Sequence, residues 1–142
     1  MHKLSDNMLV DVALPTTVLE DSQATSKYYD MREFDRAAFI ADMKVVAGTP
    51  SMQIGLRSAE DSVGTNPSDL KIGTPGVIDE DKVAVMEVKA EDLVEGKPWV
   101  ALVIDNSGFG TICNATIAAA LHAPHQAFEN KIGADFLYNT WE

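Results

Sequence analysis

The stretch 36-RAAFIADMKV-45 decides the fold, because apolar side chains occupy every second position in it. Successive side chains of a β-strand point to opposite faces of the sheet, so this period of two predicts a strand with one buried face. The predicted buried side comprises Ala37, Phe39, Ala41, Met43 and Val45. The other side is mixed and comprises Arg36, Ala38, Ile40, Asp42 and Lys44.

The same period recurs later in the chain. Met52, Ile54 and Leu56 alternate with polar or small residues, and residues 83–88 alternate in the same way. Between these strands, residues 58–82 are rich in Gly, Pro and acidic residues, which is typical of a long surface loop. We expect at most one short strand in it, around residues 70–72.

Two long apolar runs, 99-WVALVIDN-106 and 110-GTICNATIAAAL-121, end the regular part of the chain. Gly108 and Gly110 lie between them, where a turn with positive backbone angles costs little, so we predict a β-hairpin. A helix over residues 112–121 is the rival interpretation, because alanine is a good helix former. The β-branched residues Thr111, Ile112, Thr116 and Ile117 favour a strand.

These patterns predict an all-β fold, an antiparallel β-sandwich of the jelly-roll or immunoglobulin-like kind. Residues 26–121 would form the sandwich, between an N-terminal arm (1–25) and a C-terminal arm (122–142) that packs on the domain or on a neighbour. The arms carry the apolar side chains Leu9, Val10, Phe128, Phe136 and Trp141. The predicted core comprises Phe39, Ala41, Met43, Ile54, Leu56, Val85, Trp99, Ala101 and Val103.

The composition limits the function. A chain of 142 residues suits one domain, and its formal charge of −11 with only 11 basic residues argues against binding to a nucleic-acid backbone. The single cysteine, Cys113, excludes an intrachain disulfide and favours an intracellular origin. Acidic residues interrupt the first apolar stretch, so we expect no signal peptide. No apolar run approaches the roughly 20 residues of a membrane helix.

Charged residues gather in 28-YYDMREFDRAAFIADM-43, where Asp30, Glu33 and Asp35 could supply paired carboxylates for acid–base chemistry. On a strand, however, Asp30 faces away from Glu33 and Asp35, which divides the set. We therefore interpret this stretch as the entry to a strand, with cross-strand ion pairs that help to fix the register.

Other candidate sites are weaker. His122 and His125 are three residues apart, but Pro124 lies between them and no further metal ligand follows at a standard spacing. The acidic stretch 79–82 lacks the spacing of a calcium loop, and 107-SGFG-110 lacks the residues of a phosphate loop. Asn114–Thr116 matches a glycosylation acceptor, and Cys113 is expected to be a buried apolar residue. We predict no catalytic, cofactor-binding or metal-binding residues, and no enzyme.

Two stretches, 28–43 and 79-DEDKVAVMEVKAEDLVEGKPWVALVIDNSG-108, followed by an Ala-rich last strand, resemble the head decoration (cement) proteins of tailed bacteriophages. The likeness covers residues 28–121 and rests on short motifs. In that group a Tyr/Asp/Arg-rich step enters a strand, and an acidic strand and turn precede an aromatic-led strand.

The resemblance implies a capsid protein of the virion, often a homotrimer, that binds the outside of the phage head. It would stabilise contacts between major capsid subunits. From the apolar side chains of the two ends, and not from the resemblance, we expect residues 1–14 and 122–142 to be the reaching arms. It would be made in the cytoplasm of the bacterial host, without binding membrane or nucleic acid. The alternatives are a head–tail connector or tail protein, and a carbohydrate- or ligand-binding module whose aromatic platforms would come from Tyr28, Tyr29, Trp99, Tyr138 or Trp141.

Overall fold

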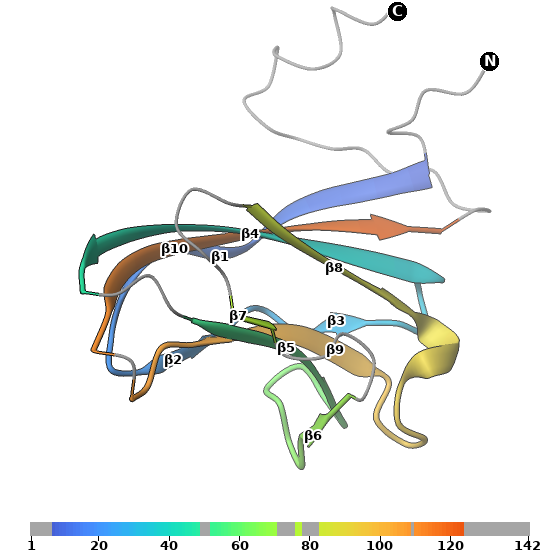
Figure 1. Ribbon diagram of the computed structural model, residues 1–142. Helices are drawn as coiled ribbons and strands as arrows, with labels where there is room; N and C mark the ends of the chain where they lie inside the picture. Colours follow the sequence, from blue (N-terminus) through green and yellow to red (C-terminus); the bar gives the residue numbers. More distant parts are fainter. Residues whose placement is uncertain (1–6, 49–51, 71–75, 78–82, 109, 124–142) are drawn as a thin grey trace, which may run out of the picture.

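The computed structural model describes residues 7–48, 52–70, 76–77, 83–108 and 110–123, which form two facing antiparallel sheets (Figure 1). Sheet A has the order β1-β10-β4-β8, and sheet B the order β2-β9-β5-β6, with β3 paired to β9 and β7 to β5. The strands are β1 (Met8–Glu20), β2 (Gln23–Thr25), β3 (Tyr29–Asp30), β4 (Arg36–Ala47), β5 (Gln53–Ala59), β6 (Ser68–Asp69), β7 (Gly76–Val77), β8 (Val83–Lys89), β9 (Trp99–Asp105) and β10 (Ile112–His122).

The all-β antiparallel sandwich is confirmed. No α-helix occurs among the residues that the structure describes; Ala90–Asp92 is a short 3₁₀ turn, and β10 is a strand throughout. The helical alternative for residues 112–121 is therefore wrong. β10 pairs with β1 on one side and with β4 on the other, so its backbone hydrogen-bonding groups are used by the sheet.

The core lies between the two sheets. Phe39 is fully buried and packs against Tyr29 of β3, with ring centroids 6.0 Å apart and an interplanar angle of 51°. Ala41 and Met43 follow it inward on β4, and Ile54 and Leu56 face them from β5. The burial predicted for these five residues is confirmed.

The four other predicted core residues lie outside the central cluster, although Ala101 and Val103 are buried. Val85 is 60% exposed, because Met86 and Val88 are the buried positions of β8. Valines occupy both phases of this strand, so its alternation did not reveal which phase faces the core. Trp99 is only partly buried, and Ala101 and Val103 are buried on the outer face of sheet B, outside the central cluster.

The predicted hairpin of residues 99–121 is wrong. β9 belongs to sheet B and β10 to sheet A, so the chain crosses from one layer to the other between them (Figure 1). Most connections in this fold cross in the same way, including β1 to β2 and β4 to β5. β9 and β10, which are consecutive in the sequence, therefore pair with other strands and not with each other.

The predicted N-terminal arm is largely part of the sandwich. β1 is an edge strand of sheet A and places Ala13 and Leu19 in the core. The register between β1 and β10 is irregular around Pro15. Proline has no N–H to donate to a neighbouring strand, so it is tolerated in an edge strand, which is unpaired on one side. Residues 1–6 and 124–142 lie outside the described residues. His122 ends β10, and Ala123 is buried.

Part of the predicted loop 58–82 is regular. Ser58 and Ala59 complete β5, and β6 and β7 both pair with β5. The short strand expected around residues 70–72 lies slightly earlier, at Ser68–Asp69, whereas residues 71–75 and 78–82 lie outside the described residues.

Candidate functional site

The charged cluster of residues 30–36 forms a turn between β3 and β4. Arg32 donates two hydrogen bonds to the Asp30 carboxylate, each 2.8 Å long, and these bonds hold the pKa of Asp30 below its ordinary value. Asp35 instead contacts Nδ1 of His122, 2.7 Å away at the end of β10. Asp30 and Asp35 thus have separate partners, and the Asp30–Arg32 pair is local, not cross-strand as we expected.

The other sequence candidates are not brought together. Cys113 is fully buried, its Sγ lies 3.1 Å from Sδ of Met52, and burial raises the pKa of its thiol, which opposes a role as a nucleophile. Asn114 and Thr116 lie on the opposite side of β10, where Thr116 Oγ1 is 3.0 Å from Thr16 Oγ1. His125 and the stretch 79–82 fall outside the described residues.

No group of three or more His, Cys, Asp or Glu that could hold a metal ion occurs among the residues that the structure describes. Within the same residues, no helix is long and apolar enough to cross a membrane.

The outer face of sheet A carries exposed apolar side chains. In the strand register, Val12 of β1 is opposite Ala118 of β10, Ala118 is opposite Ile40 of β4, and Ile40 is opposite Val85 of β8. Val12, Ile40 and Val85 are 53%, 38% and 60% exposed. This line of four residues, here called the apolar row, crosses the whole sheet.

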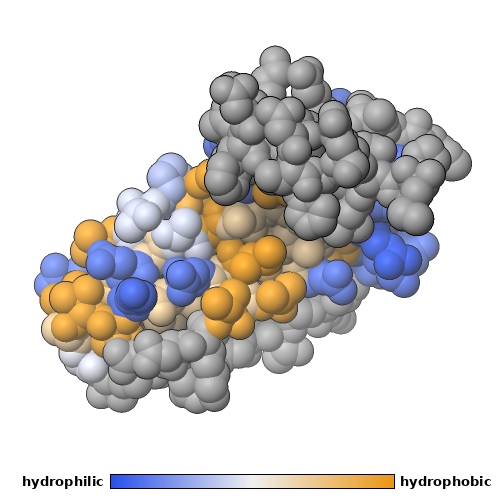
Figure 2. Space-filling model, turned by 90° about the horizontal axis from the view of Figure 1, so that it is seen from above, coloured by the Kyte–Doolittle hydropathy of each residue, from blue (hydrophilic) through white to orange (hydrophobic). Residues whose placement is uncertain are grey.

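Neighbouring positions extend the apolar row. Val10, Ala120 and Ala38 form the next line, and Val83 lies beside Val85 on β8. In the two central strands this part of the face consists of alanines and Ile40, whereas valines lie at its two edges. Figure 2, which looks onto this face, shows the apolar side chains gathered beside charged ones.

The charge on this face differs from that of the whole chain. Among the residues of the described strands, alternation places three basic and three acidic side chains on this face, a balance of zero in a protein whose formal charge is −11. They are Arg36, Lys44, Lys89, Glu20, Asp42 and Glu87. Another acidic protein can therefore approach this face without the repulsion expected elsewhere.

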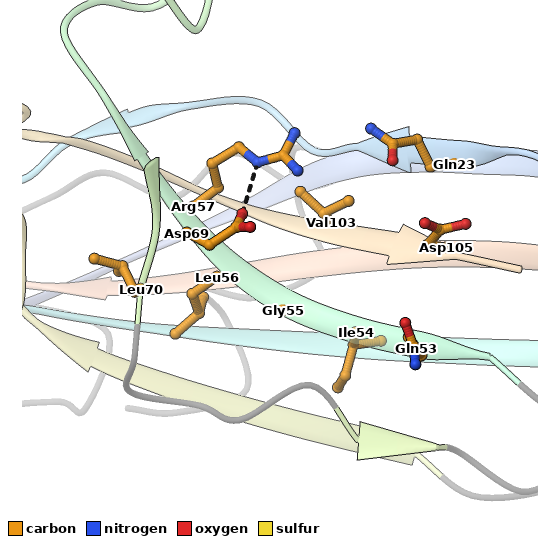
Figure 3. A pocket seen from close by; sticks show the side chains of 10 residues that line it. All are labelled: Gln23, Gln53, Ile54, Gly55, Leu56, Arg57, Asp69, Leu70, Val103 and Asp105. Atoms are coloured by element: carbon orange, nitrogen blue, oxygen red, sulfur yellow. Dashed lines mark hydrogen bonds and ion pairs between the residues drawn. The ribbon is translucent and has the colours of Figure 1, made fainter. Parts of the chain in front are cut away.

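The outer face of sheet B has a shallow hollow, here called the sheet B trough, of about 120 Å³ (Figure 3). One side is a cross-strand line of Gln23, Asp105 and Gln53. The other side is Arg57 with Asp69, joined by a 3.2 Å hydrogen bond from Nε to Oδ1. Between the two sides, Gly55 lies opposite Val103 and forms the floor.

Neither of these faces was found from the sequence. The apolar row combines strands that are distant in the chain. In the sequence, each of its members is only one of the alternating positions of its own strand. Of the predicted aromatic platforms, Tyr29 is buried, Tyr28 and Trp99 are partly exposed, and Tyr138 and Trp141 lie outside the described residues.

Comparisons with known proteins support the fold and no more. No family model matches the chain, and no curated protein matches it. Among solved structures, the SPBc2 prophage-derived protein YomS is similar with a TM-score of 0.55 and 7% identity, over 87% of this chain and 99% of that one.

Two further similar solved structures have TM-scores below 0.5. The CBM22-1 xylan-binding domain of Paenibacillus barcinonensis Xyn10C has a TM-score of 0.44 at 9% identity, covering 82% of this chain and 86% of that one. The infectious bursal disease virus structure has a TM-score of 0.46 at 9% identity, covering 80% of this chain and 31% of that one. At these identities the likeness to YomS establishes a shared β-sandwich and leaves the function to be argued from the surface.

Proposed function

We propose that this protein is a virion structural protein of a tailed bacteriophage, a decoration (cement) protein on the capsid exterior. It binds neighbouring major capsid subunits and stabilises their contacts, and it acts without catalysis or a cofactor. Its fold, shared with a prophage-derived protein, agrees with this role, as does the motif resemblance of residues 28–121.

The apolar row is the observation that carries the proposal. A monomer gains nothing by exposing valines and an isoleucine across a whole sheet, and such patches mark interaction sites. An open sheet face suits a broad protein surface better than a small ligand, because a small ligand needs a concave pocket. The balanced charge around the row makes this the favoured side for contact with a protein shell.

The area that the docking face would bury can be taken from known protein–protein interfaces. A stable interface buries about 800 Å² on each partner, and a few central apolar side chains supply most of its binding free energy. We place Val12 and Val85 among these central residues. Residues 8–14, expected at first to be a reaching arm, act here as part of β1, where Val10 and Val12 belong to the docking face.

Substitution of Val12 and Val85 by Asp tests the proposal. Both side chains point outward, so the variant is expected to fold normally, with far-UV circular dichroism and a melting temperature close to those of the unchanged protein. A buried unpaired carboxylate is costly, so binding to purified undecorated shells should weaken at least tenfold in co-sedimentation.

The matched control is Val63→Asp, which changes an 82% exposed valine in the turn after β5. It should bind the shells as the unchanged protein does. Full binding by the Val12→Asp/Val85→Asp variant would show that sheet A is not the docking face. If the protein occurs in only a few copies at one vertex of the particle, it is a connector or tail component instead.

A homotrimer is part of the proposal, with second copies of the chain as further partners. Sedimentation equilibrium of the purified protein, and of the protein on shells, measures the copy number per site. Single copies scattered over the shell would contradict the trimer.

A further inference from the structure

We propose that the sheet B trough binds a neutral saccharide, on the face opposite the docking face. The inference does not depend on the decoration role, because the trough and the apolar row lie on different sheets. It assigns the molecule a second binding surface, one that stays open to solvent while sheet A is covered.

The geometry of the trough follows from the strand register. Three successive cross-strand lines run over β2, β9 and β5: first Gln23, Asp105 and Gln53, then Thr25, Val103 and Gly55, then Ala101 with Arg57. The middle line is lowest at Gly55, which has no side chain, whereas Val103 and Thr25 carry β-branched side chains. Strands lie about 4.8 Å apart, so the trough is roughly 10 Å long, room for about one or two sugar rings.

The side chains along the trough are suited to sugar hydroxyls. Amides, carboxylates and guanidinium groups are planar and present several donors or acceptors side by side. Gln23 and Gln53 line the trough, and no side-chain hydrogen bond joins either of them to a residue that the structure describes. Asp105 uses Oδ1 to accept a 2.8 Å bond from the N–H of Ser107, which fixes the orientation of its carboxylate.

The charges favour a neutral ligand. An anion would meet Asp105 and Asp69 in a protein of formal charge −11, and only Arg57 would attract it. A simple cation would be repelled by Arg57, which already neutralises Asp69 at 3.2 Å. A polyhydroxylated neutral molecule can accept from Arg57 and donate to Asp105 without a net charge to desolvate.

The affinity should be low. The trough holds about 120 Å³, below the roughly 300–1,000 Å³ of pockets that enclose small ligands, so it covers one side of a sugar only. Tyr28 provides no stacking platform here, because the turn at Gly64 packs against its ring: a Cβ on Gly64 would lie 2.7 Å from Tyr28 Cε2. Hydrogen bonds alone hold the ligand, and we expect a Kd of about 1 mM.

Amide chemical shifts test the inference. The ¹⁵N-labelled protein is titrated with maltose, cellobiose, lactose and chitobiose, and separately with inorganic phosphate. At least one disaccharide should shift the amides of Gly55, Val103 and Asp105 in a saturable way. Phosphate should leave them unchanged, and stronger shifts with phosphate than with any sugar would show that the trough selects an anion.

Two substitutions separate specific binding from weak general effects. Gly55→Val raises the floor of the trough, and Gln53→Ala removes one amide; each should weaken sugar binding at least fivefold. The control Val12→Asp lies on sheet A and should bind the sugar as the unchanged protein does. The inference would be overturned if no sugar gave saturable shifts. It would also be overturned if both trough variants gave the same shifts as the unchanged protein. Shell binding by the same variants reports separately on the decoration role.

Discussion

At the scale of single residues, Asn106 has the largest set of hydrogen bonds in the described interior. This fully buried side chain donates to the carbonyls of Leu19 and Thr111, at 3.0 and 2.6 Å, and accepts from the N–H of Ser22 at 2.9 Å. It therefore joins the β1–β2 crossing to the β9–β10 crossing. A buried amide with both ends satisfied is stabilising only while all of its partners remain in place.

The Asn106→Ala variant should lose about 2–4 kcal/mol of unfolding free energy, because the carbonyls of Leu19 and Thr111 and the N–H of Ser22 each lose a hydrogen bond. Urea denaturation followed by tryptophan fluorescence measures the loss. Asn114→Ala, on the outer side of β10, is the control and should change the free energy by less than about 0.5 kcal/mol. Equal losses of unfolding free energy in the two variants would contradict the role of Asn106 in joining the two crossings.

Phe39 and Ile40 are neighbours with opposite environments. Phe39→Ala removes a fully buried ring that packs on Tyr29, and it should cost about 3–5 kcal/mol. Ile40→Ala changes an outward side chain of the same strand and should cost well under half as much. Thermal and urea unfolding of the two variants compare them directly, and a smaller loss for Phe39→Ala would be incompatible with the core described above.

Tyr29 should make stability sensitive to high pH. Burial, followed by the 2.9 Å hydrogen bond to Asp11, raises the pKa of Tyr29 above its ordinary value of 10.0. The raised folded-state pKa means that this contribution is complete below about pH 10, where the unfolded chain ionises, and is lost as pH rises further. Tyr29→Phe should therefore reduce the fall in unfolding free energy between pH 10 and 12, measured in urea. An unchanged pH profile would contradict this assignment.

At the scale of the elements, the position of a strand in its sheet matters more than its length. β10 has partners on both sides along its whole length, whereas the longer β1 has only one partner in sheet A and an irregular register around Pro15. β9 has the same central position in sheet B. The two edges of sheet A also differ, because β8 is regular and short while β1 is long and interrupted.

Hydrogen exchange should follow this order. Backbone amides of β10, β4, β9 and β5 that bond within the sheets should exchange most slowly, near the rate of global unfolding. Those of β3 and β6, which are two residues long, should exchange much faster. Mass spectrometry or NMR at neutral pH gives the rates. Slower exchange in β1 than in β10 would mean that the edge of sheet A is covered by a further strand.

At the scale of the whole molecule, the two outer faces have different chemistry. Sheet A presents valines, alanines and balanced charge, whereas sheet B presents amides, carboxylates and one arginine over a low floor. A sandwich of this kind can hold a shell subunit on one side and leave the other side free. The formal charge of −11 favours repulsion between separate copies.

Deletions distinguish the sandwich from the chain ends. Removing residues 2–20 takes away β1, with Ala13 and Leu19 of the core, and exposes the edge of β10, so the product should not fold cooperatively. Removing residues 126–142 leaves every described core residue in place and should shift the melting temperature by no more than about 3 °C. Circular dichroism with thermal melting measures both. If the product of the first deletion folded, residues 2–20 would not be needed for the sandwich, as the N-terminal arm predicted from the sequence implies.

The sequence by itself determined the strand character of most elements and the buried side of β4 and β5. Phe39, Met43 and Leu56 alternate so regularly that local geometry alone sets their direction. These are properties of a few adjacent residues, and the period of a strand is sufficient to reveal them. The separation of Asp30 from Asp35 was predicted from a strand, whereas residues 31–35 form a turn between β3 and β4.

Only the tertiary structure decided which strands pair. β9 and β10 carry apolar side chains on both faces, so no local pattern assigns them to different sheets, and in β8 valines fill both phases. The apolar row and the sheet B trough each join strands that are separated by tens of residues. Pairing depends on burying the joint surface of the whole chain, which is a non-local free energy that single-strand patterns do not contain.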